Sequence, residues 1–208
     1  MHFKVKYLNK EVLPQIIKPL VGGLLMLTSI TYIGYHVGQS DFNELFISMS
    51  IGFLGWLMVI SSGISATKII IFGVLLRLCL VFAFPLLSDD IFRFYWDGTL
   101  TLHGLSPYGN LPTEVLKFGI PSLNQELFSV LNSPNYYTIY PPVSQLYYAV
   151  SAWFGDVFVF SIVLKSLFII TETSGAIIIV TLLKKLQLPL TLIGLYFIHP
   201  LVLIEGIG

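Results

Sequence analysis

Charged residues are scarce in this sequence, and cysteine is almost absent. Only 11% of the 208 residues are Asp, Glu, Lys or Arg, whereas 55% are hydrophobic. A soluble domain of this size cannot bury so much apolar surface, so the solvent around most of the chain is predicted to be lipid. The one cysteine, Cys79, excludes a disulfide within the chain and lies in an apolar run, where we expect it to pack.

The sequence also has no excess of charge of either sign. Eleven Lys and Arg balance eleven Asp and Glu, which argues against nucleic acid as a partner. Three lysines, Lys4, Lys6 and Lys10, precede the first apolar stretch. That stretch is long and has no clear small-residue cleavage site, so it is interpreted as a retained anchor rather than a signal peptide.

Long apolar segments are abundant instead. A helix needs roughly 20 apolar residues to cross a bilayer. Segments of this kind are 19–38, 45–65, 69–87, 157–183 and 188–208, whereas 140–154 is short for a span. We therefore predict an all-α integral membrane protein with five or six transmembrane helices.

The positions of the lysines predict the orientation, because cytoplasmic loops collect Lys and Arg. The N-terminal lysines and Lys68 are placed in the cytoplasm, and the acidic turn at 38–44 is placed outside. Segment 88–138 then faces the extracytoplasmic side. The lysine pair at 184–185 is cytoplasmic if 140–154 only dips into the bilayer and external if it crosses, so the pair favours a re-entrant or interfacial segment.

Segment 88–138 is far too long for a simple connector. It is rich in Trp, Tyr, Phe, Leu and Pro, whereas disordered segments are poor in aromatic residues. We expect it to form short interfacial helices. The chain is thus divided into a three-span membrane segment (1–87), an extracytoplasmic loop with most of the candidate chemistry (88–138) and a C-terminal membrane segment (139–208).

Two adjacent carboxylates, Asp89 and Asp90, follow the third apolar segment, where lipid ends and an aqueous cavity can begin. Shielding from water makes a carboxylate a better proton acceptor, so either residue is a candidate general base. The structural alternative is helix capping, for which Ser88 and Asp89 are suited. Adjacent helical residues point about 100° apart, so one carboxylate is expected to be the base and the other structural or a metal ligand.

Further candidates follow on the same expected helix. Arg93 and Asp97 lie four residues apart, with Asp90 three residues before Arg93 and Trp96 beside them. This cluster predicts a binding site, and the alternative is surface ion pairing worth under about 1 kcal/mol. His103 either donates to a phosphate or is a polar loop residue. The aromatic residues that either stack on a substrate or form an interfacial belt are Tyr95, Trp96, Tyr108, Tyr136, Tyr137 and Tyr140.

Three ionisable residues lie inside predicted spans, where such groups are costly and by default functional. They are Arg77, Lys165 and Glu172, and the last two lie seven residues apart on one helix face. Pairing of Glu172 with Lys165 or Arg77 would hold helices together. A proton or substrate pathway is the alternative.

Four short motifs carry a resemblance to a known superfamily. They are LSDDIFR at 87–93, YWDG at 95–98, HGLSPY at 103–108 and YTIYPPVSQ at 137–145, followed by HPLVLIE at 199–205. In this order the chain resembles the GT-C membrane glycosyltransferases from about residue 77 onward. It is most similar to bacterial mannosyltransferases that use polyprenyl-phosphate mannose, and more distantly to those of GPI-anchor assembly. Two residues depart from the family pattern: Ser106 replaces a usual Asn, and His199 replaces the Asn of a usual Asn-Pro. Family members continue beyond the position equivalent to Gly208, so we expect this chain to be a fragment.

The resemblance implies transfer of a sugar, with mannose as the first candidate, from a polyprenyl-phosphate donor to a hydroxyl of a glycan or glycolipid acceptor. The reaction would occur on the outer face of a bacterial plasma membrane, with inversion at the anomeric carbon. The acidic motif of the family falls on Asp89 and Asp90, and Arg93 and His103 would stabilise the departing phosphate. The other implied substrate-binding residues are Trp96, Asp97, Tyr108, Tyr140 and Gln145.

The sequence has no spacing of His, Cys and carboxylates typical of zinc, so no cofactor is assigned. The carboxylate pair can still recruit Mg²⁺ or Mn²⁺ through a donor phosphate. The rival function is a non-catalytic membrane component. This would be a transporter or flippase subunit built around Lys165 and Glu172, or an inactive partner of another transferase.

Overall fold

The computed structural model describes residues 12–207, and the lysines at 4, 6 and 10 lie outside this range. Helices are the regular secondary structure of the described chain, which contains no strand. Its α-helices are α1 (Val12–His36), α2 (Phe42–Ile60), α3 (Ala66–Leu80), α4 (Asp90–Leu102), α5 (Pro112–Val115), α6 (Gln125–Ser129), α7 (Pro142–Ala152), α8 (Val157–Lys185), α9 (Gly194–Phe197) and α10 (Pro200–Ile207). Two 3₁₀ helices, η1 (Leu116–Phe118) and η2 (Leu190–Ile193), complete the set. The predicted all-helical class is confirmed.

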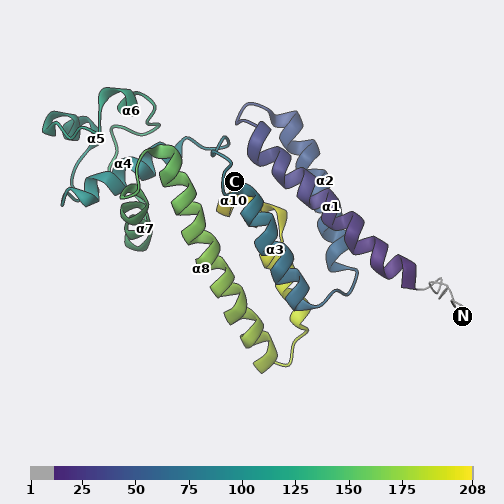
Figure 1. Ribbon diagram of the computed structural model, residues 1–208. Helices are drawn as coiled ribbons and strands as arrows, with labels where there is room; N and C mark the ends of the chain where they lie inside the picture. The colour runs from purple at the N-terminus through teal and green to yellow at the C-terminus, as the bar shows by residue number, and fades with distance from the viewer. Residues whose placement is uncertain (1–11, 208) are drawn as a thin grey trace, which may run out of the picture.

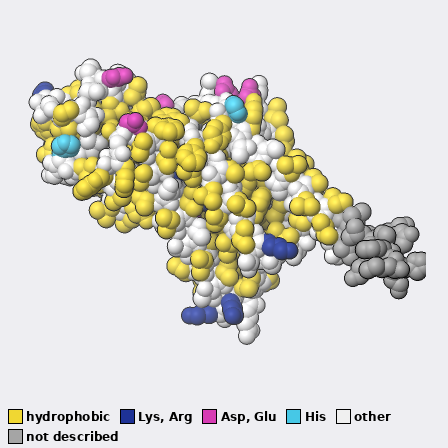
Figure 2. Space-filling view, viewed as in Figure 1, with side chains coloured by type: hydrophobic (Ala, Val, Ile, Leu, Met, Phe, Trp, Pro, Cys, Tyr) yellow, Lys and Arg dark blue, Asp and Glu magenta, His cyan; other side chains and the backbone are white. Residues whose placement is uncertain are grey.

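Three of these helices are long and apolar enough to cross a membrane. They are α1 from Gln15 to His36, α2, and the 29-residue α8. Figure 2 shows hydrophobic side chains along the flanks of the molecule and Asp and Glu along its upper edge, with Lys and Arg at the lower tip, on the right flank and at the upper left. Apolar flanks with charges at the ends are the pattern expected of helices that stand in a bilayer.

Two predicted spans are not single long helices. α3 has 15 residues, which at 1.5 Å per residue is roughly 22 Å and shorter than the roughly 30 Å hydrocarbon core. The segment from 188 is interrupted between α9 and α10, at Ile198 and His199. The reason is Pro200, which lacks an N–H and disfavours helical geometry in the residue before it.

The helices form two packed bodies (Figure 1). In one, α1, α2, α3, the later part of α8 and α9–α10 enclose an apolar core that includes Met26, Leu76 and Phe197. In the other, which we call the lobe (residues 90–152), α4 to α7 surround a second core with Trp96 at its centre and the first turns of α8 at its edge. The lobe therefore lies at the start of α8.

Helix α7, which the sequence division placed in the C-terminal membrane segment, packs inside the lobe. Its Tyr148 ring stacks on Phe94 of α4 with centroids 4.5 Å apart. The close approach needs Gly98, because a Cβ there would collide with the carbonyl oxygen of Tyr148. With 11 residues, α7 extends roughly 16 Å, about half of the hydrocarbon thickness.

An ion pair ties α3 to α8 and α9. The Nε of Arg77 donates to Glu172 Oε2 at 2.5 Å, and its Nη1 donates to the carbonyl of Phe197 at 2.7 Å. The guanidinium also lies 4.1 Å from the centre of the Phe197 ring. Of the two pairings proposed for Glu172, the structure contains the one with Arg77, and Lys165 does not take part.

Helices α1 and α2 are in backbone contact. A Cβ on Gly55 would lie 2.5 Å from the Gly22 carbonyl oxygen and 2.9 Å from the Met26 nitrogen. Both are backbone atoms and cannot rotate away. The pair of helices can approach this closely only because these positions are glycine.

We expect Gly55→Ala to destabilise the folded protein by about 1–3 kcal/mol, because overpacking forces the helices apart. The matched control is Gly175→Ala, where the new methyl group meets open space and alanine favours the helix by up to about 1 kcal/mol. Thermal unfolding in detergent should show the first variant less stable and the second unchanged or more stable. Equal stability of the two variants would contradict the close packing.

Candidate functional site

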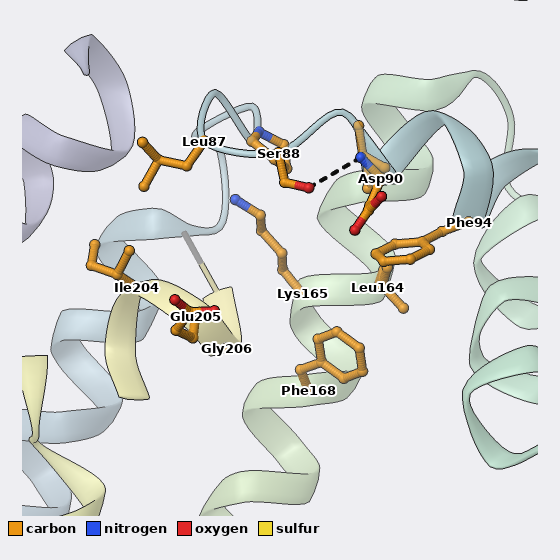
Figure 3. A pocket seen from close by; sticks show the side chains of 12 residues that line it. Leu87, Ser88, Asp90, Phe94, Leu164, Lys165, Phe168, Ile204, Glu205 and Gly206 are labelled. Carbon is orange, nitrogen blue, oxygen red and sulfur yellow. Dashed lines mark hydrogen bonds between the residues drawn. The ribbon is translucent and has the colours of Figure 1, made fainter. Parts of the chain in front are cut away.

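A cavity of about 270 Å³ opens where the lobe meets the longer helices. Its walls come from the turn before α4, the start of α4, one face of α8 and the last turn of α10 (Figure 3). The polar side chains on these walls are Ser88, Asp90, Lys165 and Glu205. The apolar ones include Leu87, Phe94, Leu164 and Phe168. Apolar walls with a few convergent polar groups are typical of small-molecule sites.

The two adjacent carboxylates are not equivalent. Asp90 is half-buried and lines the cavity, whereas Asp89 is exposed and does not. The amide of Asn132 donates to Asp90 Oδ1 at 2.6 Å and so orients this carboxylate. Asp90 is therefore the better placed of the two candidate bases.

Helix capping by Asp89 is not what the structure contains. Asp89 occupies the N-cap position of α4, but its side chain accepts no capping hydrogen bond. The hydroxyl of Ser88 instead accepts from the N–H of Asp90 at 3.2 Å. The adjacent carboxylates thus occupy different surroundings, and their separate roles stay a prediction.

Tyr140 lies close to Asp90 at the start of α7. Burial of its ring and the negative charge of Asp90 raise the pKa of Tyr140 to about 12. Its phenol is thus neutral at physiological pH and can only donate or accept a hydrogen bond there. Tyr108 donates to the Tyr140 carbonyl at 2.6 Å, so these two predicted site residues are brought together, with Tyr108 acting on the backbone.

Arg93, Asp97 and Gln145 form a second group, buried inside the lobe. Arg93 Nε donates to Asp97 Oδ1 at 2.9 Å, and Gln145 Nε2 donates to Asp97 Oδ2 at 3.1 Å. The Arg93 and Asp97 side chains are only 2% and 1% exposed. The alternative of a surface ion pair is therefore wrong.

The remaining donors of Arg93 hold the chain ahead of α7. Nη1 donates to the Ser133 carbonyl at 2.8 Å, and Nη2 donates to the Tyr136 carbonyl at 3.0 Å. Arg93 is not among the residues that line the cavity. Its position differs from that expected for a phosphate ligand, because protein oxygens already surround its guanidinium.

Two other predicted residues lie away from the cavity. Trp96 is fully buried against Phe128, so it presents no ring face to a substrate. His103 follows the last residue of the 13-residue α4, about 20 Å along the helix from Asp90. Its Nδ1 lies 2.8 Å from the Thr99 carbonyl oxygen. Neither residue is placed to touch a ligand beside Asp90.

Lys165 and Glu205 also line the cavity, although the sequence did not predict either as a member of the site. Lys165 is 4% exposed, and its Nζ donates to the carbonyls of Ala83 at 2.6 Å and Leu80 at 3.3 Å. The sequence does show a lone lysine inside an apolar helix. It does not show toward which side of α8 that lysine points. Glu205 appeared only as the last residue of a motif.

Metal binding has little support in the geometry. Within the part of the chain that the structure describes, no three His, Cys, Asp or Glu side chains converge on one point. Asp90 and Glu205 share the cavity with Lys165, whose positive charge opposes a cation. Mg²⁺ or Mn²⁺ would need further oxygen ligands from a substrate.

Comparison of the chain with family models, with curated proteins and with solved structures finds no match. The similarity to the GT-C glycosyltransferases therefore rests on the short motifs of the sequence. Function has to be argued from the cavity itself.

The buried pair in the lobe can be tested by removing one charge. We expect Asp97→Asn to destabilise the protein by about 3–5 kcal/mol, because Arg93 is then left buried without a counter-ion. The exposed Asp89, changed to Asn, is the control and should leave stability within about 0.5 kcal/mol. Chemical unfolding in detergent measures both. A stable Asp97→Asn protein would show that Arg93 is not held by this pair.

Proposed function

We propose that this chain transfers a sugar, mannose being the first candidate, from a polyprenyl-phosphate donor to a hydroxyl of a glycan or glycolipid acceptor. The observation that carries the proposal is the half-buried Asp90 carboxylate at a cavity with apolar walls. An acceptor needs a base beside it, and a lipid donor needs apolar surface. The cavity offers both within one site.

Asp90 is the general base in this proposal. It takes the proton of the acceptor hydroxyl while the hydroxyl oxygen bonds to the anomeric carbon and the phosphate leaves with the electrons of the broken C–O bond. Attack from the face opposite the phosphate inverts the anomeric centre. Asn132 holds the carboxylate in position, and the neutral Tyr140 phenol beside Asp90 is available to hydrogen-bond a sugar hydroxyl.

The proposal also includes a topology with five crossings. These are α1, α2, α3, α8 and the interrupted α9–α10 segment, with the lobe on the extracytoplasmic side of a bacterial plasma membrane. Helix α7 stays in the lobe, where its Tyr148 packs on Phe94 of α4. Lys68 at the start of α3 and the lysines at the end of α8 then share the cytoplasmic side, as the positive-inside rule requires.

The transporter alternative was built on Lys165 and Glu172 as a pathway. In the structure Glu172 pairs with Arg77. A non-catalytic partner of another transferase stays as the rival, and the substitution experiment below separates the two.

Asp90→Asn should lower sugar transfer by about 100-fold or more, because loss of a general base typically costs 10²–10⁴ in rate. Transfer is measured from radiolabelled polyprenyl-phosphate mannose in membranes of a host that lacks the gene. Asp89→Asn is the matched control and should retain transfer, since its carboxylate is exposed and outside the cavity. Equal activity of the two variants would remove Asp90 as the base.

Failure of the intact chain to transfer mannose, under conditions where a known transferase does, would favour the alternative of a non-catalytic partner. Other polyprenyl-phosphate sugars should be offered in the same membranes before the reaction class is abandoned. Transfer of one of them, lost in Asp90→Asn, would change the sugar and keep the mechanism.

The topology can be tested by labelling with a membrane-impermeant maleimide. With Cys79 changed to Ser, single cysteines are introduced at Ser106 in the lobe and at Lys184 near the end of α8. In intact cells Ser106→Cys should be labelled and Lys184→Cys should react only after permeabilisation. Labelling of both in intact cells would mean that α8 does not separate the two sides.

A further inference from the structure

Lys165 places a positive charge at the wall of the cavity without forming an ion pair there with a described residue. Its ammonium is buried and forms no ion pair with any carboxylate in the described part of the chain. Two carbonyl oxygens, those of Leu80 and Ala83, accept its hydrogen bonds. These contacts satisfy donors but do not neutralise charge, and an uncompensated buried charge is costly. An anion in the cavity would remove that cost.

A purely structural role explains only part of this arrangement. The last carbonyls of a helix have no partner within it, and a lysine can cap them. Lys165 does this at the end of α3. An ammonium has three N–H donors, however, and two are used by protein oxygens. Figure 3 shows the side chain extending toward Ser88, with Asp90 on one side and Glu205 on the other.

The other walls indicate what the anion is attached to. Leu164 and Phe168 flank Lys165 on α8, and Leu87 and Ile204 close the cavity from the turn before α4 and from α10. An anionic headgroup carrying a long apolar chain fits such walls, whereas a small hydrated anion gains nothing from them.

The charge balance of the cavity limits the charge of the headgroup. One ammonium, on Lys165, faces two carboxylates, on Asp90 and Glu205. Each negative charge on the ligand is repelled by both carboxylates, and the single ammonium can pair with only one such charge. The cavity thus favours a singly charged phosphodiester over a phosphomonoester, which carries close to two charges at neutral pH.

We propose that Lys165 binds the phosphate of a lipid phosphodiester in this cavity, and that Asp90 and Glu205 select against the doubly charged lipid phosphomonoester. This rests on the proposed function for the reaction that uses the site. A sugar donor linked through phosphate to a lipid is a diester, and its lipid product is a monoester. Transfer would therefore convert a ligand that the cavity holds into one that it releases.

Binding can be measured without turnover, on the purified full chain in detergent. The probes are dihexadecyl phosphate as lipid diester, hexadecyl phosphate as lipid monoester, dimethyl phosphate as diester without a tail, and dihexadecyl glycerol as neutral lipid. At pH 7 the lipid diester should bind at least about tenfold more tightly than each of the others. Equal binding of the neutral lipid, or of dimethyl phosphate, would overturn a site built for both charge and tail.

Variants assign the effect to residues. Lys165→Met should weaken diester binding about tenfold or more, and Lys165→Arg should retain most of it. Lys184→Met, an exposed lysine at the far end of α8, should bind as the intact chain does. Glu205→Gln should narrow the preference for diester over monoester. If Lys165→Met lowers thermal stability but leaves the headgroup preference unchanged, Lys165 only caps α3 and the proposal fails.

The binding and transfer experiments can contradict the lipid site and the transferase separately. Loss of diester binding in Lys165→Met, together with no sugar transfer by the intact chain, would keep the lipid site and remove the transferase. Transfer that depends on Asp90 but not on Lys165 would keep the transferase and remove this site. Should Lys165→Met not fold, the probe series on the intact chain and on Lys165→Arg still decides the headgroup preference.

Discussion

The cost of a charge in apolar surroundings shapes this structure more than any other constraint. Arg77 is fully buried, yet its guanidinium contacts Glu172, the carbonyl of Phe197 and the Phe197 ring. To satisfy one cation the chain must bring α3, α8 and α9 to a single point. Helix α10 continues from α9 and ends at the cavity, so the position of Glu205 depends on the same contact. The ion pair thus fixes the frame on which the cavity wall is built.

The need to pair a buried charge also determines the path of a loop in the lobe. Arg93 and Asp97 form an ion pair on α4. The Nη1 and Nη2 groups of Arg93 donate hydrogen bonds to the carbonyls of Ser133 and Tyr136. Those carbonyls belong to a stretch without helix, which otherwise has few partners for its backbone. A buried pair of this type adds little net stability over an apolar core, but it specifies one arrangement. It is a reason why the start of α7 lies beside Asp90.

Composition and apolar runs were enough to predict the helical class and the three longest spans, because each of these features is local in sequence. The interruption before Pro200 was also local, and hydropathy alone overlooked it. The spacing of Arg93 and Asp97 correctly indicated that they share a face. Nothing in that spacing showed that the residues from 133 to 138 would cover the pair and turn a surface feature into a buried one.

The cavity was harder to predict, because its residues come from segments that are distant in sequence. Asp90 was found because it follows an apolar segment directly. Lys165 and Glu205 join it from helices about 75 and 115 residues later, and only the rotation of α8 and the break before α10 bring them there. Partners that are distant in sequence depend on packing, which one sequence does not display. Residues that interact within one turn, such as Ser88 and Asp90, are the ones a sequence can show.

Phe168 is the side chain that packs against both apolar cores, and it also lines the cavity. Each core is closed by its own residues, whereas the space between them is bounded by the few that both bodies share. The volume open to a ligand is therefore coupled to the packing of both cores through this one ring.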